Sequence, residues 1–226
     1  MDIVRDRLKT GGIVYLSYNC LPGWSEMAPL RRLLYDTIYN DSGPILSRLK
    51  RAFAFIVKFK NANPLYFKDT PKSKILWDIM IKENPHYVAH EYLNADWTLF
   101  YHADVVKDMS TAKLSYVGST QIIENFDKYL FSPAILSQIN QVENLTYKET
   151  LKDYTLNQHF RRDVFVRGIT RFSLDEQIDC YANPPFALFL PRHLCKLRVK
   201  LPIGEVVLNA SFYNPILDAI SEKPKP

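Results

Sequence analysis

The stretch LKTGGIVYLSYNCLPGW, residues 8–24, decides how the N-terminal part of the chain folds. The two glycines at 11–12 are expected to end a short helix, because glycine readily takes the left-handed conformation found at helix ends. The unbroken apolar run at 13–16 is typical of a strand that is covered on both faces of a sheet. A Pro-Gly turn at 22–23 then leaves the strand, and Ser25 is expected to cap the next helix.

Helix-capping patterns recur along the rest of the chain. Pro44 and Pro133 suit the first position of a helix, and capping boxes are expected at 146–149 and 173–176, the first of them starting a helix that reaches Phe160. Short strands are expected at 98–101, 114–117, 164–166, 186–190, 197–199 and 206–208. The sequence therefore predicts an α+β fold that is predominantly helical with several short strands.

The composition favours a folded protein in a reducing compartment. Of the 226 residues, 47% are apolar and 13% aromatic, which is enough material for a packed core. No apolar run approaches the roughly 20 residues that a membrane-spanning helix needs, and the first residues lack the apolar core of a secretory leader. Three cysteines without C-x-x-C spacing argue against a disulfide framework and a zinc site. We therefore expect a cytoplasmic protein.

The charge is mildly basic, with a formal net charge of +5 and a pI near 9.0. The 29 Lys and Arg residues are interspersed with 24 Asp and Glu residues, whereas nucleic-acid binders usually gather positive charge on one face. Neither nucleic acid nor a membrane is therefore expected as a partner. A basic binding module for protein or nucleic acid is kept as an alternative function.

Three stretches together resemble the methyltransferase regulatory domain family. The first is residues 8–24, the second is HEYLN at 90–94 followed by Phe-Tyr at 100–101 and LSYVG at 114–118, and the third is LKDYTLNQHFR at 151–161. In that family the regulatory domain follows the class I core of bacterial methyltransferases, including protein-lysine methyltransferases. The order and spacing of the three stretches make the resemblance more specific than any one of them alone.

The resemblance implies a division of the chain into three parts. Residues 1–40 are expected to be the C-terminal remnant of a class I methyltransferase α/β core, residues 41–180 the regulatory domain, and residues 181–226 the start of a truncated C-terminal domain. The implied function is the regulatory and substrate-handling part of an enzyme that uses S-adenosylmethionine to methylate protein, with lysine as the expected target. The implied partners are a catalytic core, in cis or in trans, and a protein substrate.

The glycines argue against a cofactor site in this chain. Class I cores bind S-adenosylmethionine at a glycine-rich turn that follows a strand. Of the seven glycines only those at 11–12 adjoin each other, and they precede the expected strand. We therefore expect a catalytically silent fragment that binds no cofactor itself. The strand at 13–16, without its sheet, is expected to fray, to pair with a second copy or to dock onto the missing half.

Five residues around the end of this strand are the candidates for facing the substrate: Tyr18, Asn19, Pro22, Gly23 and Trp24. Ligands of open parallel sheets lie beyond the carboxyl ends of the strands, where this loop is expected. An aromatic ring and an amide there suit a channel for the substrate nitrogen, because methyl transfer depends on positioning and desolvating the amine. The alternative is that Trp24 only packs the strand against the following helix.

A second set of candidates, for a regulatory role, comprises His90, Glu91, Asp153, Tyr154, Phe160 and Arg161. The alternative is that they are packing and surface residues of helices. No metal site is expected, because position 87 between His86 and His90 is a tyrosine where the H-E-x-x-H pattern has glutamate.

The motif NPPF at 183–186 matches the catalytic motif of methyltransferases that act on amino groups. Such a motif needs a glycine-rich cofactor loop elsewhere in the chain, so we interpret it as a Pro-Pro break before a strand. A small self-contained enzyme with an unrecognised site is the other alternative.

Overall fold

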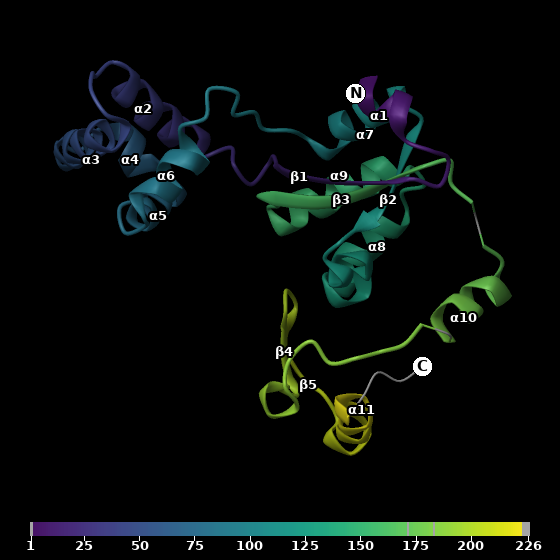
Figure 1. The fold of residues 1–226 in the computed structure, drawn as a ribbon. Helices are drawn as coiled ribbons and strands as arrows, with labels where there is room; N and C mark the ends of the chain where they lie inside the picture. Colours follow the sequence, from purple (N-terminus) through teal and green to yellow (C-terminus); the bar gives the residue numbers. More distant parts are fainter. Residues whose placement is uncertain (1, 171, 183, 223–226) are drawn as a thin grey trace. The chain divides into compact units, whose positions relative to one another are not determined.

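The computed structural model describes residues 2–170, 172–182 and 184–222. Helices outweigh strands, and the strands form two small sheets, which confirms the expected α+β, predominantly helical fold class (Figure 1). Contacts divide the chain into two compact units, one made of 16–108 and 144–162, the other of 1–15, 109–143 and the residues from 163 onward. The domain boundaries at residues 40 and 180 stay predictions.

Five consecutive helices, called here the helical bundle, lie in the first of these units: α2 (Ala28–Tyr39), α3 (Ile45–Asn61), α4 (Leu65–Asp69), α5 (Pro71–Met80) and α6 (Pro85–Tyr92). Pro44 is the N-cap of α3, one position before the expected one. Asn84 caps α6, because its side-chain oxygen accepts the N–H of His86 at 2.9 Å. These two helices thus start either at proline, which has no N–H group to leave unpaired, or at a residue whose side chain accepts a backbone N–H.

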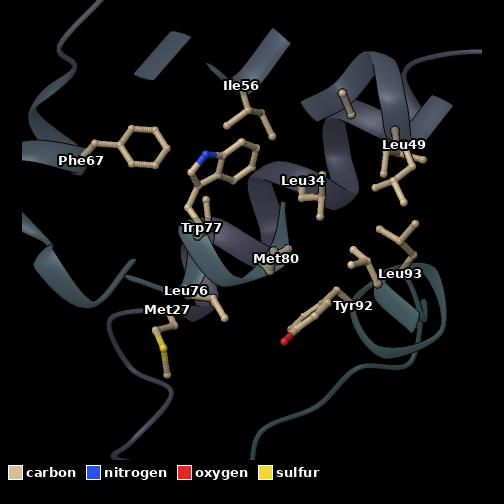
Figure 2. Close-up of a cluster of buried hydrophobic side chains, with 14 of the residues drawn as sticks. Met27, Leu34, Leu49, Ile56, Phe67, Leu76, Trp77, Met80, Tyr92 and Leu93 are labelled. Atoms are coloured by element: carbon tan, nitrogen blue, oxygen red, sulfur yellow. The ribbon is translucent and has the colours of Figure 1, made fainter. Parts of the chain in front are cut away.

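The helical bundle encloses one apolar core, to which all five helices contribute (Figure 2). The labelled side chains are Met27, Leu34, Leu49, Ile56, Phe67, Leu76, Trp77, Met80, Tyr92 and Leu93. The largest of them, Trp77, is fully buried and meets the ring of Phe53 edge-to-face at 5.5 Å between centroids. Burying a large apolar side chain contributes about 1.5–3 kcal/mol, so this core holds the bundle together.

Helix α9 (Leu145–Leu156) starts and ends differently from the prediction. Asn144 caps it by accepting the N–H of Tyr147 at 2.9 Å, so the capping box expected at 146–149 is wrong. Asn157 ends it in the left-handed conformation, with φ of 49°, which asparagine tolerates better than most residues. The expectation that this helix reaches Phe160 is therefore also wrong.

The three-stranded sheet has the order β1-β3-β2, with β1 (Ile13–Asn19), β2 (Leu114–Ser119) and β3 (Phe160–Arg167) (Figure 1). Helix α7 (His102–Thr111) leads into β2. β2 and β3 are antiparallel, with Tyr116 opposite Phe165 and a bulge between Tyr116 and Gly118. The strands expected at 114–117 and 164–166 are thus confirmed.

β1 pairs with β3 in the antiparallel sense. The N–H of Arg167 donates to the carbonyl of Gly12 at 3.0 Å, and the N–H of Cys20 donates to the carbonyl of His159 at 2.9 Å, so residue numbers run in opposite directions along the two strands. Gly11 has φ of 77° and donates to the carbonyl of Arg167 at 2.7 Å. This is the geometry of a bulge that requires glycine at its first position.

Two expectations about the strand at 13–16 are wrong. It has a sheet, because β3 pairs with it from far along the chain, a partner that the local pattern does not show. It is not covered on both faces, because Ile13 is 66% and Tyr15 55% exposed, whereas Val14 and Leu16 are half-buried.

Three smaller expectations also fail. The N-cap of α2 is Met27, because Ser25 donates its N–H to Pro22 in the preceding turn. Residues 98–101 supply one bridge, from Phe100 to Cys20, instead of a strand. Residues 186–190 form no strand.

The remaining elements are α1 (Asp2–Arg7), the 3-10 helices η1 (Ile122–Asn125), η2 (Asp127–Tyr129) and η3 (Arg192–Leu194), α8 (Pro133–Asn140), α10 (Leu174–Ala182), β4 (Arg198–Leu201), β5 (Gly204–Val207) and α11 (Ala210–Glu222). The start of α8 at Pro133 agrees with the prediction, and the strands expected at 197–199 and 206–208 correspond to β4 and β5, which pair antiparallel. The capping box of α10 is confirmed, because the N–H of Ser173 donates to the Glu176 carboxylate at 2.7 Å. In the described part of the chain, no helix is both long and apolar enough to cross a membrane.

Candidate functional site

Residues 19–24, called here the strand-exit loop, are held on one side by Phe100. The N–H of Phe100 donates to the carbonyl of Asn19 at 3.2 Å, and the N–H of Leu21 donates to the carbonyl of Phe100 at 3.0 Å. Cys20 and Phe100 form a parallel bridge between these bonds. A single residue, Phe100, which precedes α7, thus fixes the backbone where β1 ends.

The other side of the strand-exit loop is held by the corner between α9 and β3. The N–H of Gly23 donates to the carbonyl of Gln158 at 3.0 Å, and the N–H of Cys20 donates to the carbonyl of His159. The Cys20 thiol, which is fully buried, lies 3.3 Å from the same Gln158 carbonyl. The loop is therefore bonded on both sides by residues remote in sequence.

At Gly23 the loop lies directly against the backbone of the corner. A Cβ atom there would lie 2.3 Å from the carbonyl oxygen of Gln158 and 2.8 Å from that of Asn157. Both contacts are with backbone, which cannot rotate away as a side chain does. Only glycine fits without moving the loop from the corner.

Trp24 lies in the apolar core of the helical bundle. Its side chain is 93% buried, since its exposed fraction is 7%, and its ring meets Trp97 edge-to-face at 5.0 Å between centroids. The ring centroids of Trp24 and Tyr92 are 6.3 Å apart. This placement is the packing alternative considered for Trp24: it ties the loop to the bundle.

Tyr18, at the end of β1, belongs to a buried polar pair. Its hydroxyl lies 3.3 Å from Nδ1 of His102, and both side chains are buried. The ring of Tyr18 also meets that of Phe100 edge-to-face at 6.1 Å. Asn19 is half-buried, which leaves part of it open to a ligand.

The α9–β3 corner is braced by a buried ion cluster, defined as Glu149, Lys152, Asp153 and Arg161. Arg161 donates to Asp153 at 2.5 Å and to Glu149 at 2.8 Å, and Lys152 donates to Glu149 at 2.7 Å. Arg161, Asp153 and Lys152 are all buried. Charge-assisted bonds of this kind fix the angle between a helix and a strand more firmly than packing alone.

The ion cluster shifts the protonation of Glu149. Burial by itself would raise the pKa of this carboxyl group, but the charges of Lys152 and Arg161 and their hydrogen bonds outweigh it, so the pKa lies below its ordinary value. Within the same α9–β3 corner, burial and the charge of Lys72 lower the pKa of His159.

A further buried cation outside the ion cluster, Arg31 of α2, was not among the predicted residues. Its guanidinium bonds the backbone carbonyls of Tyr92 and Asn94, and lies 4.7 Å from the ring centre of Tyr35 and 4.9 Å from that of Trp97. Burial lowers its pKa. No local pattern marks its hydrogen bonds, because the two carbonyls that accept them lie on a later segment.

The structure separates the predicted regulatory residues. Asp153 and Arg161 meet in the ion cluster, whereas Tyr154 and Phe160 are exposed. On α6, His90 is exposed and Glu91 half-buried. Sequence reasoning missed Glu149 and Lys152 of the same cluster, although charged residues three and four apart on one helix were a usable signal.

The structure also places the residues that were considered for a metal or a cofactor. No group of three or more His, Cys, Asp and Glu side chains there is placed to hold a metal ion. Asn183 of the NPPF motif lies outside the described residues. Gly11 and Gly12 precede β1, and Gly118 lies in the β2 bulge, so these glycines do not fit the turn that a nucleotide-like cofactor requires.

Comparison with known proteins finds a family model that matches the part of the chain containing Phe100 and the α9–β3 corner. Residues 84–167 match the model of a family described as a predicted methyltransferase regulatory domain. Residues 84–167 thus resemble a methyltransferase regulatory domain, and they are called here the regulatory domain. Phe100, Gln158, His159 and the whole ion cluster lie inside this regulatory domain, whereas the strand-exit loop lies outside it.

Two curated relatives are longer than this chain. An uncharacterized protein of Synechocystis, sll1526, is 37% identical over 224 residues, covering 99% of this chain and 44% of the relative. An uncharacterized protein of Rickettsia prowazekii, RP789, is 26% identical over 176 residues, covering 70% of this chain and 30% of the relative. The chain spans less than half the length of each.

Solved structures show the same fold. PKMT2 from Rickettsia typhi matches with a TM-score of 0.62 and 17% identity, over 99% of this chain and 45% of that one. Its complex with AdoHcy matches with a TM-score of 0.61 and 18% identity, over 99% and 46%. The expected resemblance to the regulatory domain family is confirmed by the match over residues 84–167, and these structures show the same fold.

Proposed function

We propose that this chain is the regulatory and substrate-handling part of a protein methyltransferase that uses S-adenosylmethionine, with lysine as the target. It works with a catalytic core, in cis or in trans, and is silent without it. The observation that carries the proposal is the bonding of the strand-exit loop to regulatory-domain residues on both sides, at Phe100 and at Gln158 with His159.

The strand-exit loop is the means of regulation in this proposal. Tyr18 and Asn19 stand at the carboxyl end of β1, and Asn19 is open enough to contact a substrate. Pro22, Gly23 and Trp24 anchor the loop, since Gly23 lies against the corner and Trp24 in the bundle core. A shift of the corner would therefore move the residues that face the substrate.

The proposal assigns cofactor binding to the core rather than to this chain. AdoHcy is bound in a structure of PKMT2, of which the matched region is less than half, and the glycines of this chain do not fit such a site. We place the protein in the cytoplasm, in keeping with its three free cysteines, Cys20, Cys180 and Cys195.

Titration calorimetry of the chain with S-adenosylmethionine tests this assignment. We expect no saturable binding up to millimolar ligand, and methylation of a protein substrate only after a catalytic core is added. Micromolar one-to-one binding by the chain alone would contradict the proposal and favour a self-contained enzyme.

A further inference from the structure

Helix α9 buries its charged face and exposes its aromatic one. Residues that are three, four or seven positions apart lie on one face of a helix. The inner face carries the ion cluster. The opposite face carries Tyr147, Leu151 and Tyr154, of which the two tyrosines are 53% and 58% exposed and the leucine is half-buried. The charged face thus attaches the helix, and the aromatic face is accessible to a partner.

Tyr101, the residue before α7, extends this aromatic face. Partial burial, the neighbouring Tyr154 hydroxyl and the carboxylate of Asp104 raise the pKa of Tyr101, so both groups lie close to its ring. Asp104 is exposed and lies one turn further along α7, where its N–H donates to the carbonyl of Tyr101 at 3.1 Å. These side chains are called here the tyrosine surface: Tyr101, Asp104, Tyr147, Leu151 and Tyr154.

The tyrosine surface lies next to both segments that hold the strand-exit loop. Tyr101 directly follows Phe100, which bonds the loop on one side. Tyr154 lies one helical turn before Gln158, which bonds the loop on the other side. A polypeptide that binds along this surface therefore comes close to the loop to which the proposed function assigns the substrate.

The chemistry of the tyrosine surface suits a transient and cationic partner. Permanent interfaces are more apolar, whereas tyrosine serves in contacts that form and dissolve, because its ring packs while its hydroxyl stays hydrated. The face of a tyrosine ring attracts an ammonium group, and the carboxylate of Asp104 is an ion-pair partner for it. A lysine side chain offers an apolar stem to the rings and an ammonium group to the carboxylate.

We propose that the tyrosine surface binds a lysine-bearing segment of the protein substrate. This inference rests on the proposed function and names the surface by which that function receives its substrate. The exposed carboxylate of Asp104 beside two tyrosine rings supplies the charge complementarity, and the adjacent strand-exit loop supplies the direction in which the segment continues.

Fluorescence anisotropy of this chain with two labelled peptides tests the surface. One peptide has a central lysine between leucines, and the other has neutral norleucine in place of that lysine. We expect saturable binding of the lysine peptide, which the double variant Tyr101→Ala, Tyr154→Ala weakens at least tenfold. Asp104→Asn should reduce the preference for the lysine peptide over the norleucine peptide by about threefold.

A matched control, Tyr87→Ala with Tyr181→Ala, replaces two tyrosines that are 50% and 77% exposed and should leave peptide binding intact. Absence of binding by the unsubstituted chain, or equal binding by the double variant of the tyrosine surface, would overturn the proposal. Because its tyrosines are exposed, that variant should melt at the same temperature as the unsubstituted chain. If it does not fold, an unchanged peptide preference in Asp104→Asn overturns the proposal by itself.

Other occupants of the surface give different results. Sedimentation as a dimer that the double variant dissociates would assign the surface to a second copy. Loss of peptide binding when the remaining part of the Synechocystis relative is added would assign it to the catalytic core. Either result overturns the proposal. Peptide binding as expected, without methylation by the reconstituted enzyme, would instead contradict the proposed function alone.

Discussion

At the scale of single residues, the strand-exit loop depends on Gly23 because of a close backbone approach and not because of an unusual φ. The Cβ of any other residue would enter the carbonyls of Gln158 and Asn157. Replacement by alanine forces a backbone shift, for which overpacking costs typically about 1–3 kcal/mol.

We predict that Gly23→Ala lowers the melting temperature by several degrees and slows methyl transfer by the reconstituted enzyme. Gly43→Ala is the matched control: its φ of 104° strains alanine, but the nearest atom is the end of a flexible side chain at 3.8 Å. Thermal unfolding followed by circular dichroism measures both variants. An unchanged melting temperature in Gly23→Ala would refute the close-contact argument.

Arg161 is the residue on which the ion cluster depends. Removing it leaves Asp153 and Glu149 buried without their shared cation, and breaking a buried ion pair in this way costs about 3–5 kcal/mol. We predict a loss of that order for Arg161→Ala in urea unfolding. As the control, Arg32→Ala removes an exposed cation that pairs with Asp36 one turn along α2, and it should cost far less, as is usual for a surface ion pair.

At the scale of elements, the ion cluster makes the α9–β3 corner sensitive to acid. The pKa of Glu149 is lower in the folded chain than in the unfolded one, so its contribution to stability is complete above the unfolded value of about 4.3 and is lost as the pH falls through the folded value. We predict that the melting temperature drops below about pH 4 and that Glu149→Gln reduces this dependence. An unchanged pH profile in that variant would contradict the assignment.

The sequence predicted elements where the signal is local and failed where it is not. Pro133 and the 173–176 capping box sit at the helix starts that they signal. The pairing of β1 with β3 joins distant segments, and no periodicity within 13–16 shows which partner arrives. The assignment of Phe160 to a helix failed because a single left-handed residue, Asn157, ends α9 before it.

The candidate site likewise contains features that have a local sequence signal and features that do not. The sequence pattern predicts a loop directly after the strand, and the strand-exit loop lies there. The pattern also singles out the glycine and the tryptophan of this loop, but it does not show their contacts. Trp24 contacts Trp97, and Gly23 contacts Gln158, only because folding brings these distant parts of the sequence together. Arg31 was missed for the same reason, since its partners are backbone carbonyls that carry no sequence signal.

At the scale of the whole molecule, residues of the regulatory domain hold a loop that lies outside this domain in the sequence. Phe100 and the α9–β3 corner bond the strand-exit loop, the bundle core anchors Trp24, and the ion cluster braces the corner. Loop position and regulatory-domain structure should therefore change together.

Amide hydrogen exchange, resolved by residue, tests this coupling most directly. We predict slow exchange at Cys20, Leu21 and Gly23 in the unsubstituted chain, because their N–H groups donate to the carbonyls of His159, Phe100 and Gln158. In Arg161→Ala, protection at Cys20 and Gly23 should fall while that of the buried bundle residue Trp77 persists. Fast exchange of the loop amides in the unsubstituted chain, or protection untouched by the substitution, would contradict the claim that the regulatory domain holds this loop.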